Sequence, residues 1–253
     1  MEPLTLSYVD DDIVRLTLQN GRGNPISMSL LDSLHGHLDT LFEKPPRAVV
    51  FDADGSRVFC GGVDLNSMID ADRETVTLFF RRLGKVIYRF LELPSVTVAA
   101  ISGHAIAGGF ILALAFDTRI VGESGLKFGL SEADLGLALP PNAVELLKMR
   151  LGAPAALRLS TYGNLFGSEE ARQLGFADER AADPEARAQM VARALADKPG
   201  QGVLLTRMFC HTGLIHQMRQ ADERYFDAFI DTWFSDDAQA RLRALADKLK
   251  KRS

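Results

Sequence analysis

Cysteine is scarce in this chain of 253 residues, which contains only Cys60 and Cys210. Neither cysteine sits in a spacing typical of a metal site or a redox motif, so we expect no disulfide framework and a reducing compartment. The histidines likewise show no ligand spacing with carboxylates or thiols, and the sequence therefore predicts no metal site.

Long hydrophobic runs and an excess of charge of one sign are also missing. The longest apolar candidate, residues 96–116, is broken by Ser102, His104 and a glycine pair, whereas a membrane span needs about 18–20 apolar residues. The net charge of -4 shows no excess of basic residues of the kind that would bind nucleic acid or an anionic membrane. The acidic start, MEPLTLSYVDDD, does not have the pattern of a secretory signal. We expect a cytoplasmic protein that binds neither nucleic acid nor membrane.

What the first half of the chain does contain is an alternation of strand and helix patterns. The first two strands are predicted to pair as a hairpin, and a buried strand is predicted to end in a turn near Gly55. This alternation is typical of an α/β fold. The predicted strands cover residues 4–9, 13–18, 47–55, 95–102 and 118–123, and the predicted helices cover residues 29–43, 75–93 and 108–116.

From about Asn142 onward, helices separated by glycine stops replace the alternation. After a short extended piece at 176–181, the rest of the chain is predicted to be helical, with apolar positions at helical spacing. We therefore predict a core over residues 1–195 and an appended helical region over residues 196–253, whose exposed apolar faces suit packing on another subunit.

Two glycine turns join predicted strands to predicted helices. One carries Gly108 and Gly109 at the start of a helix, where each glycine costs roughly 0.5–1 kcal/mol relative to alanine. The other passes over Gly61 and Gly62 into a helix capped near Asp64. Two such turns facing one pocket would form an oxyanion hole from backbone N–H groups, but tight packing explains glycines there equally well. Their spacing matches neither a phosphate-binding P-loop nor a complete dinucleotide fingerprint.

Three motifs, in their order along the chain and in the spacing between them, resemble those of the crotonase (enoyl-CoA hydratase/isomerase) superfamily. They read VFCGGVDLNSM, AAISGHAIAGGFILALAFDTRI and LKFGLSEADLGLALPP. The resemblance covers about residues 4–183. It implies a spiral of ββα units, a homotrimer or a hexamer formed as a dimer of trimers, and an acyl-CoA thioester substrate. It also implies that the backbone N–H groups of Val63 and Gly108 hold the thioester oxygen.

The resemblance places one of the family's two hydratase glutamates at Glu132, while the other would fall at Ile111. Taken by itself, Glu132 is more simply interpreted as a solvated surface residue or a helix-start residue than as a catalytic one. Hydration requires both delivery of a water and proton transfer to carbon, work that two carboxylates share. Shifting a double bond requires only one base, so this pattern resembles the monofunctional Δ3,Δ2-enoyl-CoA isomerases.

We therefore predict an isomerase with Glu132 as its single acid/base and no cofactor besides coenzyme A as part of the substrate. The alternatives are another crotonase reaction, such as that of a hydratase, decarboxylase or thioesterase, and a homologue that binds acyl-CoA without turning it over. The candidate substrate-binding residues are Gly61, Gly62, Asp64 and Ile111.

Other polar residues near the motifs have simpler interpretations. Asp64, Asp117 and Asp134 suit capping and turn roles, with a supporting role for Asp134 behind the catalytic group left open. For His104 we favour packing or hydrogen bonding over base chemistry. Asn66 stands where hydratases often carry a lysine, so the resemblance identifies no secure phosphate contact. The candidates for that contact near the C-terminus are Lys248 and Lys250.

Overall fold

A six-stranded sheet forms the centre of the computed structural model, which describes residues 2–199 and 201–250. Its strand order is β1-β2-β3-β5-β7-β10, with β1 antiparallel to β2 and every other neighbouring pair parallel. The predicted N-terminal hairpin is therefore confirmed. The strands are β1 (Leu4–Tyr8), β2 (Ile13–Leu18), β3 (Ala48–Asp52), β5 (Val96–Ile101), β7 (Thr118–Gly122) and β10 (Glu179–Ala181).

A second sheet of four short strands lies at the ends of these strands, in the order β4-β6-β8-β9. Each of β3, β5 and β7 in the large sheet is followed in sequence by a strand of the small sheet and then by helical structure. This arrangement is the predicted succession of ββα units. The small-sheet strands are β4 (Val58–Cys60), β6 (His104–Ile106), β8 (Phe128–Gly129) and β9 (Leu165–Phe166).

The small sheet was not predicted from the sequence. Its strands are only two or three residues long, which is too short for a period-2 hydrophobic pattern to appear. Two of them lie beside the predicted glycine turns, because β4 leads into the turn at Gly61 and Gly62, and β6 leads into the turn at Gly108 and Gly109. The pairing of β4 with β6 brings these two turns side by side.

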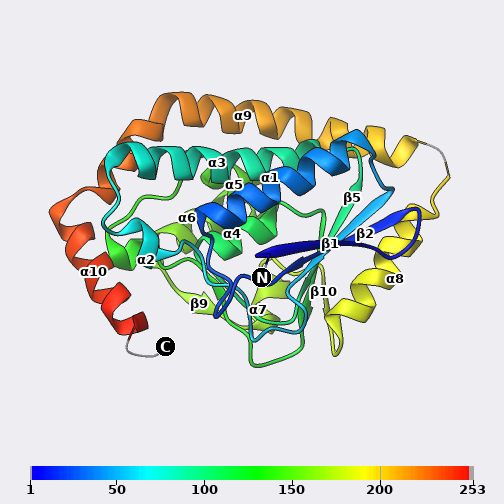
Figure 1. Cartoon of the computed structure of the whole chain (residues 1–253), viewed down its shortest axis with the longest axis horizontal. Coiled ribbons are helices and arrows are strands. Elements are labelled where there is room, and N and C mark those ends of the chain that lie inside the picture. The colour runs from blue at the N-terminus through cyan, green and yellow to red at the C-terminus, as the bar shows by residue number, and fades with distance from the viewer. Residues whose placement is uncertain (1, 200, 251–253) are drawn as a thin grey trace.

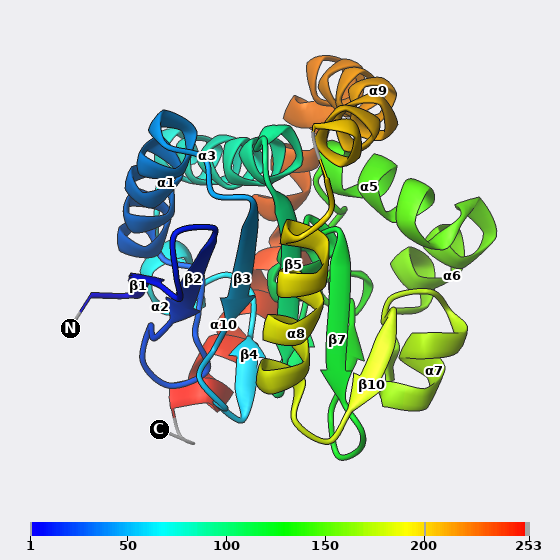
Figure 2. The ribbon, with the colours of Figure 1, turned by 90° about the vertical axis from the view of Figure 1, so that its right-hand side faces the viewer.

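Helices cover both faces of the large sheet. In Figure 2, α8 runs along β5 on the near side of the sheet. Buried residues of α1 and α3 pack in one apolar cluster, and those of α8 pack in a second cluster on the other face. The long helix α9 runs along the top of Figure 1, next to α3, and α10 descends at one end of the molecule. The helices are α1 (Met28–Glu43), α2 (Leu65–Met68), α3 (Arg73–Glu92), α4 (Gly108–Leu114), α5 (Pro141–Leu151), α6 (Ala153–Tyr162), α7 (Ser168–Gln173), α8 (Pro184–Ala196), α9 (Gly202–Trp233) and α10 (Asp236–Lys250).

The apolar residues divide into two clusters, one on each side of the sheet. Alternate residues of β3 show the division: Val49 and Phe51 belong to the larger cluster, and Ala48 and Val50 belong to the cluster beneath α8. Because side chains alternate across a strand, a strand that is buried on both faces reads as an unbroken apolar run. Within the described ranges, no helix is long and apolar enough to cross a membrane.

The C-terminal helices are part of the larger cluster. Phe229 and Trp233 of α9 and Leu242 of α10 are buried in it. A partly buried ion pair also ties α9 to the residue that precedes β7, because Arg207 Nε donates to Asp117 Oδ2 at 2.6 Å. The predicted helical region therefore packs on the core of its own chain, and its division from residues 1–195 stays a proposal.

Candidate active site

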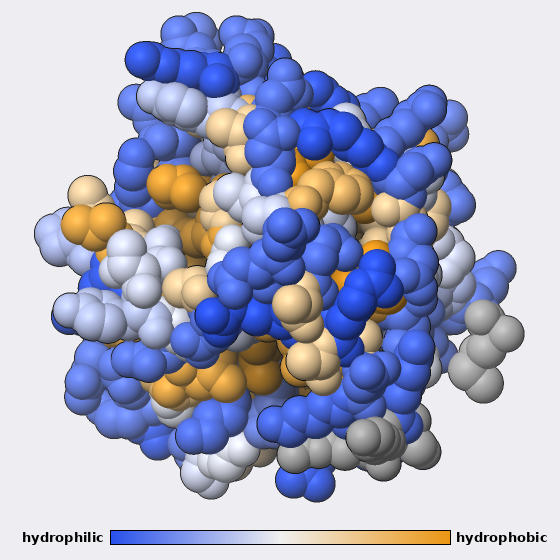
Figure 3. All heavy atoms as spheres, turned by 90° about the vertical axis from the view of Figure 1, so that its left-hand side faces the viewer, coloured by the Kyte–Doolittle hydropathy of each residue, from blue (hydrophilic) through white to orange (hydrophobic). Residues whose placement is uncertain are grey.

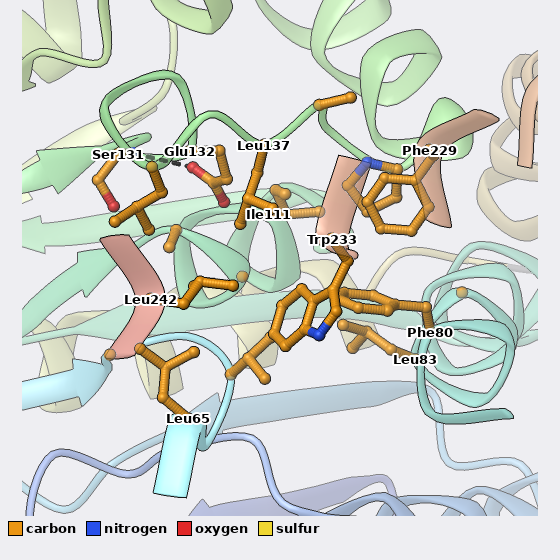
Figure 4. Close-up of a pocket in the computed structure, with 18 of the residues that line it drawn as sticks. Leu65, Phe80, Leu83, Ile111, Ser131, Glu132, Leu137, Phe229, Trp233 and Leu242 are labelled. Carbon is orange, nitrogen blue, oxygen red and sulfur yellow. Dashed lines mark hydrogen bonds between the residues drawn. The ribbon is translucent and has the colours of Figure 1, made fainter. Parts of the chain in front are cut away.

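A cavity lies between the two glycine turns, helices α3 and α4, and the C-terminal helices α9 and α10. It encloses about 900 Å³ of space, including the solvent at its mouth. Figure 4 shows Ser131 and Glu132 at one end of the group and Phe80, Leu83 and Trp233 gathered at the other. On the face of the molecule that carries α10, apolar side chains are visible in recesses between hydrophilic ones (Figure 3). The cavity therefore has one polar end and a long apolar remainder.

The two glycine turns meet at the wall of this cavity. A Cβ added to Gly62 would lie 3.2 Å from the amide nitrogen of Gly108, and one added to Gly108 would lie 3.7 Å from the amide nitrogen of Val63. Val63 and Gly108 both line the cavity. Within the described ranges, neither of their amides donates a hydrogen bond to another residue. The structure thus places two backbone N–H groups without a hydrogen-bond acceptor among the described residues close together at the wall of the cavity.

The glycine pair at the start of α4 has a packing reason as well. A Cβ on Gly109 would lie 2.1 Å from the carbonyl oxygen of Cys60, so no other residue fits there. The preceding residue, Ala107, adopts φ 53° and ψ -127°, a conformation that costs a non-glycine residue of order 1–3 kcal/mol. Its amide donates to the carbonyl oxygen of Gly129 at 2.9 Å, which helps to hold the turn. Close packing and amide presentation therefore coexist in this turn.

Glu132 is the only ionisable side chain among the described residues that line the cavity. It directly precedes the short 3₁₀ helix η1 (Ala133–Leu135), and its Oε2 accepts a hydrogen bond from the amide of Ser131 at 2.8 Å (Figure 4). Burial raises the pKa of this carboxyl above its ordinary value, while bonds from its own amide and that of Ser131 pull the pKa the other way. Glu132 is therefore a base of increased strength in an apolar setting.

Ile111 also lines the cavity and is 4% exposed. It lies one helical turn after Gly108 on α4, as the sequence predicted. The position that would hold a second carboxylate therefore presents a hydrocarbon side chain to the cavity.

Two of the candidate binding residues, Asp64 and Gly62, are not among the residues that line the cavity, and both make structural contacts elsewhere. Asp64 caps α2, because its side chain accepts from the amide of Asn66 at 3.2 Å. Gly62 adopts φ +92°, and its carbonyl oxygen accepts from the amide of Ile26 at 2.7 Å. Gly61 does line the cavity. The predicted cap at Asp64 is confirmed, and no contact of Asp64 with the cavity is present among the described residues.

The other polar residues near the motifs make structural contacts. His104 Nδ1 accepts from the amide of Lys127 at 3.0 Å, which confirms a hydrogen-bonding role. Asp117 accepts from the amide and hydroxyl of Thr97 as well as from Arg207. The backbone carbonyl of Asp134 accepts from Arg241 of α10. Within the described ranges, no group of His, Cys, Asp and Glu side chains could hold a metal ion.

Sequence reasoning missed the part of the cavity wall that comes from the C-terminal helices. The residues Leu242, Leu245 and Leu249 line the cavity from α10. Their spacing of three and four is the pattern of one apolar helix face, but the sequence alone suggested another subunit as the partner of that face. Lys248 and Lys250 lie on the same helix and are exposed.

Comparison with known proteins gives one consistent family. Residues 9–250 match the family model described as enoyl-CoA hydratase/isomerase. A probable enoyl-CoA hydratase from Bacillus subtilis is 26% identical over 96% of this chain and 95% of its own length. The human mitochondrial enoyl-CoA delta isomerase 1 is 28% identical over 93% of this chain and 79% of its own length.

Solved structures show the same fold. A crystal structure of an enoyl-CoA hydratase from Mycobacterium ulcerans aligns with a TM-score of 0.82 at 27% identity, covering 89% of this chain and 98% of that one. The human mitochondrial delta3-delta2-enoyl-CoA isomerase aligns with a TM-score of 0.90 at 24% identity, covering 99% of both chains. Hydratase and isomerase names are both represented among these relatives.

Proposed function

The chain belongs to the enoyl-CoA hydratase/isomerase family, within the crotonase superfamily, and from that premise we propose that it is a Δ3,Δ2-enoyl-CoA isomerase. A single observation carries the proposal: among the described residues, the cavity is lined by one ionisable side chain, Glu132. Ile111 presents hydrocarbon where a second carboxylate would stand. One base is sufficient to move a double bond. Hydration requires both the activation of a water molecule and the transfer of a proton to carbon, and two carboxylates share these tasks.

In the proposed reaction the thioester oxygen lies against the amides of Val63 and Gly108. The Glu132 carboxylate takes a proton from C2 of the 3-enoyl thioester, and the electrons of that C–H bond pass into a dienolate whose negative charge rests on the thioester oxygen. The same carboxyl then returns its proton to C4, which leaves the double bond between C2 and C3. Each preorganised N–H donor contributes about 10²–10³ in rate, and the acid/base group about 10²–10⁴.

The environment of Glu132 suits both halves of this cycle. Desolvation raises its pKa and so makes it a stronger base toward a carbon acid. The protonated form that results is uncharged, and an apolar cavity favours it until the proton is returned. The hydrocarbon side chain of Ile111 helps to exclude water, which disfavours hydration as a side reaction.

Hydration is the second candidate, because relatives of this chain carry the name hydratase. A one-glutamate hydratase would have to position its water without a second carboxylate. The decarboxylase, thioesterase and non-catalytic alternatives stay open as well.

Coenzyme A enters the proposal as part of the substrate, without a separate cofactor. We propose that the exposed Lys248 and Lys250 of α10 contribute positive charge near the thioester's nucleotide. A homotrimer or a dimer of trimers, a cytoplasmic location and the organisation into residues 1–195 and 196–253 are also proposals.

The direct test is incubation of the purified protein with a 3-enoyl-CoA, and separately with a 2-enoyl-CoA, in deuterated water. We expect the 3-enoyl compound to become the conjugated 2-enoyl compound, detected by its ultraviolet absorption, without the mass of an added water. A hydroxyacyl product from either substrate would contradict the isomerase assignment and favour the hydratase. Binding of acyl-CoA without any turnover would favour the non-catalytic alternative.

The pH dependence of isomerisation provides a second prediction. Only the ionised form of Glu132 can take the C2 proton, and burial raises its pKa above the ordinary 4.5. We therefore expect kcat/KM to fall as the pH decreases, with a midpoint above 4.5. The measurement is the kcat/KM profile on a 3-enoyl-CoA across the acid range. A profile without an acid limb, or with a midpoint below 4.5, would show that Glu132 is not this base.

A further inference from the structure

Three aromatic rings stand at the end of the cavity that lies away from Glu132. They belong to Phe80 of α3 and to Phe229 and Trp233 of α9, and all three are buried. Phe80 packs edge to face against Phe229, with ring centroids 4.8 Å apart, and against Trp233, with ring centroids 5.5 Å apart. Figure 4 shows these rings grouped together, across the cavity from Glu132. We call Phe80, Phe229 and Trp233 the end wall.

A second layer of rings supports the end wall from behind. Phe79 packs edge to face against Phe80 at 5.3 Å between centroids, and Phe226 packs against Phe229 at 5.8 Å. Both supporting rings are buried, and neither lines the cavity. The exposed Arg81 covers this layer, because its guanidinium carbon lies 4.3 Å from the centroid of the Phe226 ring. Since close-packed layers resist displacement, the end wall is a fixed boundary of the cavity.

Apolar side chains make up most of the rest of the cavity lining. They include Leu83, Ile87, Ile111, Leu137, Leu242 and Leu245. The side-chain oxygen of Asn142 and the indole nitrogen of Trp233 are buried in the wall with almost no accessible area, so a bound chain does not reach them. Burial of apolar surface is therefore the source of affinity for an acyl chain here, and each methylene that enters adds to it.

The open space inside the cavity limits how long a bound chain can be. The centres of water-sized groups can occupy about 120 Å³ of it, and one such group needs about 10–15 Å³ on this measure. The cavity therefore has room for roughly ten groups of this size. A methylene is similar in size to a water molecule, so a chain of about ten carbons would fill the cavity from the Val63 and Gly108 amides to the end wall. A longer chain would have to displace buried rings, which costs free energy.

We propose that the end wall sets the maximum acyl length, and that the substrate class of this enzyme is short- and medium-chain acyl-CoA of up to about ten carbons. Phe80, Phe229 and Trp233 determine this specificity by contact with the end of the chain, and they take no part in proton transfer. This inference rests on the proposed acyl-CoA function, but it applies to isomerisation and hydration alike.

The test measures binding of saturated acyl-CoAs by calorimetry, so it does not depend on turnover. The probes are the even-numbered chains from butanoyl-CoA to hexadecanoyl-CoA. We expect the affinity to increase about fourfold for each added methylene up to decanoyl-CoA, and to stop rising or to fall for longer chains. An affinity that still rises to hexadecanoyl-CoA, or that stops rising before octanoyl-CoA, would overturn the proposal while leaving the acyl-CoA function intact. No binding of any of these probes would count against the acyl-CoA function itself.

Two variants assign the length limit to the end wall. Phe80→Leu and Trp233→Leu each replace a ring by a smaller side chain, and we expect either change to raise the affinity for dodecanoyl-CoA severalfold relative to that for hexanoyl-CoA. Because the two residues lie on different helices, one variant remains informative if the other does not fold.

Phe90→Leu is the matched control for these variants. Phe90 is also buried on α3, but it packs against Phe51 and Phe116 and does not line the cavity. The same loss of a buried ring there should leave the ratio of dodecanoyl-CoA to hexanoyl-CoA affinity as in the wild-type protein. An unchanged ratio in both end-wall variants, or an equal change in Phe90→Leu, would overturn the assignment.

Discussion

Glu132→Gln is expected to lower the kcat for conversion of a 3-enoyl-CoA by about 10²–10⁴, the contribution of a general acid/base group. The replacement keeps the shape and removes the only ionisable group among the described lining residues. The amides of Val63 and Gly108 belong to the backbone, so the variant should still bind the thioester. We therefore expect a large fall in kcat with a small change in substrate affinity.

The control for this variant is Glu170→Gln. Glu170 lies on α7, is exposed, and does not line the cavity. The same chemical change there should leave kcat unaltered. Deuterium incorporation at C2 during incubation in deuterated water provides an independent readout, since it requires the proton abstraction assigned to Glu132. A Glu132→Gln protein that keeps wild-type turnover would exclude the single-base mechanism.

Gly109→Ala is expected to lower the free energy of unfolding by about 3 kcal/mol, at the upper end of overpacking effects. The added Cβ would lie 2.1 Å from the carbonyl oxygen and 2.6 Å from the carbonyl carbon of Cys60. Cys60 belongs to β4, which is paired with β6, so its backbone cannot move away without breaking the small sheet. The measurement is chemical denaturation of the variant and the wild-type protein.

Gly213→Ala provides the matched control for that experiment. Gly213 lies within α9, is exposed, and an added Cβ there meets nothing within 4 Å. Alanine in an open helical position should stabilise the protein by roughly 0.5–1 kcal/mol. Replacing glycine by alanine is thus expected to lower the free energy of unfolding at Gly109 and to raise it at Gly213. A stable Gly109→Ala protein would contradict the close approach of α4 to β4.

The glycine pair at the start of α4 shows what sequence reasoning could and could not distinguish. Glycine at a helix start signals that the backbone is needed close to something, but not what that something is. For Gly109 it is the carbonyl oxygen of Cys60, and for Gly108 it is the other turn at Gly62 and Val63. Both alternatives left open by the sequence, tight packing and amide presentation, are present in one turn.

By itself, the sequence determined the order of the long strands and helices, the hairpin and the two glycine turns. These features depend on the period of apolar residues and on the conformations that local residues permit, both of which can be recognised within a few positions of the chain. Glu132 was singled out only by the resemblance of its motif to the family. The strands of the small sheet were too short to carry such a period.

Only the tertiary structure decided which groups share the cavity. Asn142 and Asp222 are 80 positions apart, and Arg207 and Asp117 are 90 apart, yet each pair is in hydrogen-bond contact. The same packing brings α10 over the cavity of its own chain and leaves Glu132 as the lone ionisable group among the described lining residues. A periodic apolar pattern predicts which face of a helix is buried. The surface against which that face packs depends on the packing of the whole chain.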